Sequence, residues 1–209
     1  MATEKKNQST MKKALIIGVL SSTTTGISAV IGGSVTQYVD FGRRFLEFIS
    51  TLVAFVVYRK LSKNPDIPAD KQAAIQWRAC LITSIVMICS GLLLSLVSIL
   101  SFSTDAQHGN LIPGYIVAIL GVLINLYFCI SYYRSLQKEK DPIIKSQFQM
   151  FRAKTGVDFC VVFTLSCFIF APNWTLLPWI DLCGSLIVAI FLFVEGIRNY
   201  KQTKRGDTL

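Results

Sequence analysis

The chain has 209 residues, of which 52% are hydrophobic and 16% are charged, and its mean hydropathy is +0.52. An ordinary soluble domain carries about 25% charged residues, so this composition excludes a typical soluble fold and indicates a protein that lies in a lipid bilayer. The net charge is +9, but the basic residues gather between apolar runs, which is typical of membrane topology rather than of nucleic-acid binding. We therefore expect an integral, multi-pass membrane protein with no nucleic-acid partner.

Apolar runs of helical length follow one another along the whole chain. A helix needs about 20 predominantly apolar residues to cross about 30 Å of hydrocarbon. The runs that reach or approach this length are residues 13–31, 34–58, 75–101, 112–133, 147–171 and 176–200. They predict an all-α membrane protein with six transmembrane helices in one domain, residues 13–200.

The basic residues predict how these helices are oriented. Of the 21 Lys and Arg residues, 19 lie near the two ends of the chain or in and beside the second and fourth connections between runs. The connections on the other side, residues 103–111 and 172–177, contain none. Cytoplasmic loops carry the excess of Lys and Arg, so we expect both termini in the cytoplasm. Residues 1–12 then form a polar N-terminal segment, and residues 201–209 form a short tail with no C-terminal cytoplasmic domain.

The second run carries charges in its first half, namely Asp40, Arg43, Arg44 and Glu47. An alternative with five spans treats this segment as a loop. The remainder, residues 48–58, is then too short to cross a bilayer, and the termini would lie on opposite sides. A continuous helix avoids both problems and places Asp40 near Arg44, and Arg43 near Glu47, at i,i+4 spacing, where opposite charges meet.

The fifth run contains a similar pair, because Lys154 and Asp158 lie one helical turn apart. A charge at the centre of a membrane helix costs roughly 2.5–3.5 kcal/mol on insertion scales, so such residues face the bundle interior or a polar cavity. Arg43, Glu47, Lys154 and Asp158 are therefore candidates for an ion or substrate site. The alternative is that both pairs are structural and hold helices together, and position along the chain does not decide between the two.

Two further polar residues are secondary candidates, together with Asp40 and Arg44. Asn125 in the fourth run either links helices or binds a substrate, and Asp181 at the start of the sixth run is favoured as an N-terminal charge on its helix. His108 is the one histidine and lies in a loop, which is too little for a metal site. Phosphate loops, nucleophile elbows and metalloprotease motifs are absent. We expect no catalytic residue, no enzyme activity, no resident cofactor and no protein-held metal.

The second helix of the cation diffusion facilitator family typically reads S-A-L-L-A-D-A-x-H-S-L-x-D, and residues 34–47 read SVTQYVDFGRRFLE. With one extra residue before it, Asp40 matches the first Asp of that motif, Arg43 matches the His and Glu47 matches the last Asp. The chain resembles the transmembrane domain of this family in its pattern of spans as well.

Other helices of the family support the same resemblance. Its fifth helix carries A-x-x-x-(H/D)-x-x-x-D, and residues 150–158 read MFRAKTGVD, so Asp158 matches the final Asp and Lys154 takes the place of the preceding ligand. Arg78 matches an Arg at the start of the third helix, and Asp181 matches an Asp that opens the sixth. The resemblance covers residues 14–200.

The resemblance implies six helices with cytoplasmic termini, a homodimer, and export of zinc or related divalent cations in exchange for protons. It also implies a metal site with two ligands from the second helix and two from the fifth. At those positions this chain has Arg43, Glu47, Lys154 and Asp158, whose charges sum to zero when the bases are protonated. Arginine has no lone pair to offer a metal, and a neutral site gives a divalent ion little field to offset its dehydration.

Two functional hypotheses follow. The first is a secondary transporter of this family that moves a cation, possibly a divalent metal such as zinc in exchange for protons, with the usual metal site replaced by Arg43, Glu47, Lys154 and Asp158. The second is a non-transporting or regulatory scaffold subunit of the same fold, with a salt-bridged, metal-free site. An unrelated six-helix membrane protein is a third reading. The transported species, the coupling ion and the particular membrane stay open.

Overall fold

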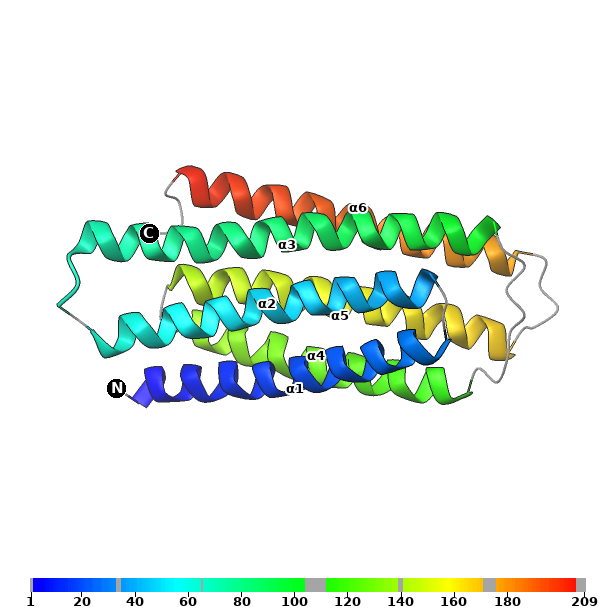
Figure 1. The fold of residues 1–209 in the computed structure, drawn as a ribbon, viewed down its shortest axis with the longest axis horizontal. Helices are drawn as coiled ribbons and strands as arrows, with labels where there is room; N and C mark the ends of the chain where they lie inside the picture. Colours follow the sequence, from blue (N-terminus) through cyan, green and yellow to red (C-terminus); the bar gives the residue numbers. More distant parts are fainter. Residues whose placement is uncertain are drawn as a thin grey trace.

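The computed structural model describes residues 2–32, 35–64, 66–103, 112–138, 141–170 and 176–205, and this part of the chain is almost entirely helical with no strand. The helices are α1 (Ala2–Gly32), α2 (Val35–Lys63), α3 (Ala69–Ser103), α4 (Ile112–Leu136), α5 (Pro142–Phe170) and α6 (Leu177–Arg205). They run side by side along the length of one elongated bundle, and α1 begins at the same end at which α6 ends (Figure 1). The prediction of an all-α protein with six helices is confirmed.

Several helices extend beyond the apolar runs. Helix α1 starts at Ala2, α3 at Ala69 and α5 at Pro142, each before its apolar run begins. The start of α5 has a clear local cause, because Oδ1 of Asp141 accepts hydrogen bonds from the backbone N–H groups of Ile143 (2.8 Å) and Ile144 (3.1 Å). An aspartate in this position satisfies donors that the first helical turn leaves unpaired, and proline is favoured as the first helical residue.

The helices differ in how apolar they are. Three contain described stretches that are long and apolar enough to cross a membrane, namely Ala69–Leu100, Ala118–Leu136 and Leu182–Lys204. Helices α2 and α5 carry the charged side chains of the middle of the bundle, among them Arg43, Glu47 and Lys154. The apolar helices α3 and α6 pack against each other along much of their length, whereas α2 and α5 touch at few points.

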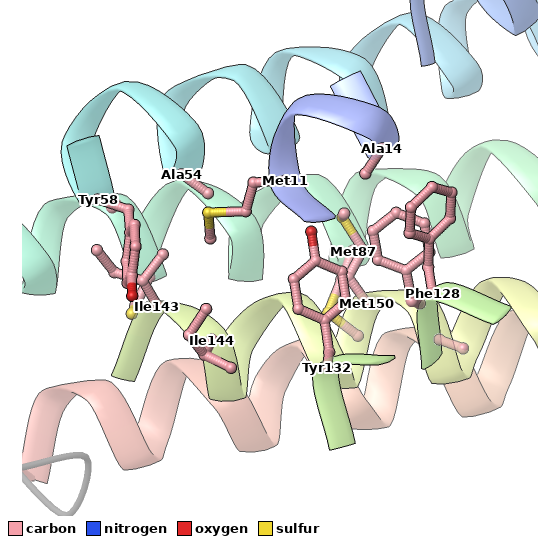
Figure 2. Packing of buried hydrophobic residues seen from close by; sticks show 14 of the residues in the cluster. Met11, Ala14, Ala54, Tyr58, Met87, Phe128, Tyr132, Ile143, Ile144 and Met150 are labelled. Carbon is pink, nitrogen blue, oxygen red and sulfur yellow. The ribbon is translucent and has the colours of Figure 1, made fainter. Parts of the chain in front are cut away.

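A tightly packed core fills the end of the bundle at which α1 begins. Ten of its members are labelled in Figure 2: Met11, Ala14, Ala54, Tyr58, Met87, Phe128, Tyr132, Ile143, Ile144 and Met150. Met11, Tyr132 and Ile144 have no exposed surface at all. Polar side chains in this region bond to each other, as in the hydrogen bond that Asn7 Nδ2 donates to the Tyr58 hydroxyl (3.1 Å). We name this region the packed end.

Candidate functional site

A cavity of about 680 Å³ lies inside the bundle next to the packed end. Its described walls come from α1, α2, α3, α4 and α5, and each of the four main candidate residues lines it. Phe128 and Phe151 belong both to the packed core and to the cavity wall. The core therefore closes one end of the cavity.

Glu47 is the centre of a buried ion-pair cluster that joins α2 to α5. Arg43 Nη1 donates to Glu47 Oε1 at 3.0 Å from one turn earlier on the same helix. Lys154 Nζ reaches the other oxygen, Glu47 Oε2, at 3.3 Å from α5. The side chains of all three residues are at least 86% buried, with exposed fractions of 8%, 9% and 14% for Arg43, Glu47 and Lys154. Both oxygens of one carboxylate are thus engaged by cations, so Glu47 has little capacity left for a further ligand.

The expected pair of Lys154 and Asp158 does not form. Asp158 Oδ2 instead accepts a hydrogen bond of 2.6 Å from Asn125 Nδ2 on α4. The same oxygen lies against Gly121, where an added Cβ would approach it to 3.1 Å. Spacing of four residues puts two side chains on one face of a helix, but Lys154 reaches across to α2 while Asp158 meets α4. The cross-helix neighbours decide the pairing.

The secondary candidates have different outcomes. Asn125 links α4 to α5 through Asp158 and also lines the cavity. Arg44 lines the cavity, and its Nη1 donates to the hydroxyl of Ser21 on α1 at 3.1 Å. Asp40 and Asp181 fall within α2 and α6, but their side chains lie outside the described residues.

No group of three or more His, Cys, Asp and Glu side chains in the described part of the chain could hold a metal ion. His108 lies outside the described residues. Cavity-facing hydroxyls on α1 are also engaged, since Thr24 and Thr25 donate to the backbone carbonyls of Leu20 and Ser21 at 2.8 and 2.9 Å. The cavity therefore offers charged and amide groups rather than a metal-ligand cage.

Sequence reasoning missed two residues that shape this site. Gly121 leaves room for the Asp158 carboxyl against α4, and Ser21 accepts a hydrogen bond from Arg44. A signal for Gly121 was present, because it lies four residues before Asn125 and thus on the same helical face. Nothing comparable distinguishes Ser21 from the other hydroxyls of its run.

Ionisable side chains buried inside a bundle of apolar helices are typical of ion and substrate pathways in membrane proteins. The chain matches the family model of the cation efflux transmembrane domain over residues 14–205. It therefore belongs to the cation diffusion facilitator family, whose members are integral membrane transporters of cations and not enzymes. A search of curated proteins gives no match to the chain.

Proposed function

We propose that this chain is a secondary transporter in which Glu47 and Asp158 bind the transported cation and Lys154 carries the exchanged proton. The observation that supports the proposal is the buried ion pair between Lys154 Nζ and Glu47 Oε2 at 3.3 Å inside the cavity. A protonated Lys154 is an internal cation in the place where a transported cation would bind. Unlike arginine, lysine can lose its proton when it is buried, and the loss would release one oxygen of Glu47 to the cargo.

The proposed arrangement in the membrane follows the charge pattern and the family. All six helices cross the bilayer, residues 13–200 form the transmembrane domain, and residues 1–12 and 201–209 lie in the cytoplasm. The positive-inside rule supports this orientation, and family resemblance supports a homodimer. The shared end of α1 and α6 is then the cytoplasmic end (Figure 1), so the packed end closes the cavity on that side. Arg44 links α2 to α1 and Asn125 links α4 to α5 in the wall of the cavity. Asp40 and Asp181 lie toward the side of the membrane opposite the cytoplasm.

Transport is tested with the purified full chain in proteoliposomes that contain a pH-sensitive dye. Gradients of zinc, manganese, potassium and an organic ammonium ion are imposed separately at several pH values. We expect at least one cation to drive proton movement, and Lys154→Met to abolish it. Glu195→Gln is the matched control, because Glu195 is a buried, ion-paired acid that is not among the described residues lining this cavity. Unchanged proton movement in Lys154→Met contradicts the proposed role of Lys154.

The scaffold function is favoured by one observation, namely that both oxygens of Glu47 are already engaged by cations. A purely structural cluster can often be replaced by apolar side chains of similar volume without loss of stability. The triple variant Arg43→Met, Glu47→Leu, Lys154→Met therefore separates the two functions. If the chain is a scaffold, the unmodified protein shows no transport. The triple variant then keeps its fold and its association with other subunits. Transport that is present in the unmodified chain and absent in a folded triple variant contradicts the scaffold function.

A further inference from the structure

We propose that the cavity binds a singly charged, amphipathic organic ammonium ion, with its nitrogen at Asp158 and its apolar part against α3, α4 and α5. This substrate class deepens the transport function proposed above and rests on it for movement of the ligand, whereas binding itself rests on the cavity alone.

The size and walls of the cavity fit an organic molecule better than a metal ion. A metal ion with six waters occupies roughly 200 Å³, given about 30 Å³ for each water, whereas the cavity holds about 680 Å³. Sites for small organic ligands commonly measure about 300–1,000 Å³ and have mostly apolar walls. The apolar part of this wall includes Leu94, Val97, Leu120, Ile124 and Val161. These apolar side chains have no atoms that could replace the waters of a hydrated metal ion.

Asp158 has the geometry to receive the ammonium group. Its Oδ2 is held by Asn125 Nδ2 at 2.6 Å, and no ion pair with a described residue engages the carboxyl group. Asp158 also lines the cavity, so its Oδ1 can accept a hydrogen bond from a ligand. A hydrogen bond between an ammonium group and a carboxylate is short and about twice as strong as a neutral one. Glu47 differs, because cations already engage both of its oxygens.

The aromatic side chains of the wall favour a cation as well. Phe128 and Phe151 line the cavity, and the faces of aromatic rings attract ammonium groups within about 6 Å. Lys154 Nζ already lies 4.8 Å from the centre of the Phe151 ring. An ammonium group is therefore compatible with this part of the wall.

The balance of charge selects a single positive charge. The charged side chains among the described cavity residues are Arg43, Arg44, Lys154, Glu47 and Asp158. When the Lys154 ammonium releases one proton to solvent and one monovalent cation enters, the total charge of the cavity is unchanged. A divalent cation raises that charge by one, which is unfavourable because the five charged side chains already carry a net charge of +1. Exchange of one proton for one ammonium ion is thus the balanced step.

The cavity reaches the surface of the bundle between α1 and α4. Leu20 and Leu120 line the cavity and are 67% and 52% exposed, which indicates that the cavity is open at this place. These two helices make few direct contacts with each other. In a bilayer such an apolar opening faces hydrocarbon, and an amphipathic amine can enter from there because its apolar part partitions into lipid.

Binding is tested with tritiated phenylbutylamine and the purified full chain in detergent. Phenylbutanol and phenylbutyrate are competitors of matched size with neutral and negative head groups. We expect saturable binding of the amine, competition by the alcohol and the acid that is at least about tenfold weaker, and at least about tenfold lower affinity in Asp158→Asn. Glu195→Gln is the control that keeps the affinity. Equal affinity for amine and alcohol, or full affinity in a folded Asp158→Asn variant, overturns the proposal.

A second variant covers the case in which Asp158→Asn does not fold. Val161→Phe narrows the cavity from an exposed position on α5 and leaves Asp158 in place. We expect weaker binding of phenylbutylamine, and unchanged binding in this variant overturns the proposal. Release of one proton per bound amine in weakly buffered solution, and its loss in Lys154→Met, supports the exchange step.

The outcome also separates this inference from the proposed function. Amine binding without movement in proteoliposomes supports the site and contradicts transport. Zinc-driven proton movement without amine binding supports transport and overturns the ammonium site.

Discussion

The packed end and the cavity both contain buried polar side chains, but they satisfy them differently. At the packed end several buried polar groups are neutral and bond to one another across helices, as in the hydrogen bond from Ser50 to Thr83 (2.9 Å). In the cavity they are charged, two cations share Glu47, and Asp158 has no cationic partner among the described residues. Hydrogen-bonded pairs of neutral side chains hold helices together at little cost in free energy. A buried charge that lacks part of its partners is costly, and such a charge is found where a ligand supplies the missing partner.

The largest expected effect comes from removing the shared charge of this cluster. Glu47→Gln removes the charge that Lys154 pairs with inside the bundle, and loss of one partner of a buried ion pair costs about 3–5 kcal/mol. Thermal unfolding of the variant in detergent measures the loss of stability. Glu195→Gln is expected to lose less, because its partner Arg152 is 41% exposed and solvent screens the unpaired charge. Equal losses in the two variants would mean that the cavity screens charge as well as the surface does.

Removing a core side chain at the packed end should have a comparable or smaller effect, with a different cause. Met11→Ala deletes a fully buried side chain and leaves a void in a closely packed region, for which about 2–5 kcal/mol is expected. The matched control on the same helix is Ile16→Ala, because Ile16 is 58% exposed. Thermal unfolding in detergent compares the two variants. A small loss in Met11→Ala would show that α1 is not part of the core that closes the cavity.

The sequence predicted the six helices and the residues that surround the cavity better than it predicted their pairing. Hydropathy placed Glu47 in the second span and Lys154 in the fifth, the family resemblance put both at one site, and the structure brings them together. The same reasoning paired Lys154 with Asp158, which is wrong, because spacing along one helix does not reveal competing partners on α2 and α4. Hydropathy also left the polar start of α1 outside the apolar run, although Asn7 is buried there through its contact with Tyr58. The roles of the site residues in transport stay predictions.

A smaller effect is expected from Gly121→Ala, which alters the position of Asp158 without changing any charge. The added methyl group would lie 3.1 Å from Asp158 Oδ2, so the carboxyl group that Asn125 holds must shift by a few tenths of an ångström. Overpacking of this kind costs about 1–3 kcal/mol. Gly156→Ala is the control on α5, because its added Cβ meets no atom within 4 Å, and alanine stabilises a helix relative to glycine by roughly 0.5–1 kcal/mol. Thermal unfolding and amine binding should both fall in the first variant only, and parallel behaviour of the two variants would contradict the close approach of Asp158 to α4.

The smallest effect is expected at the start of α5, beyond the packed end. Asp141→Ala removes the acceptor of two backbone hydrogen bonds, and loss of such a cap costs about 1 kcal/mol.

Burial raises the pKa of Asp141 above its ordinary value of 3.8, although the N–H groups of Ile144 and Ile143 oppose this shift. The folded state therefore holds this proton more tightly than the unfolded state. Its stability should decrease as the pH rises from about 3.8 through the raised pKa. Asp141→Asn keeps the acceptor without this charge, so at neutral pH it should be at least as stable as the unmodified chain and should lack this pH dependence. Thermal unfolding of the three proteins between acidic and neutral pH measures both effects, and an Asn variant as unstable as the Ala variant would show that charge rather than hydrogen bonding makes the cap.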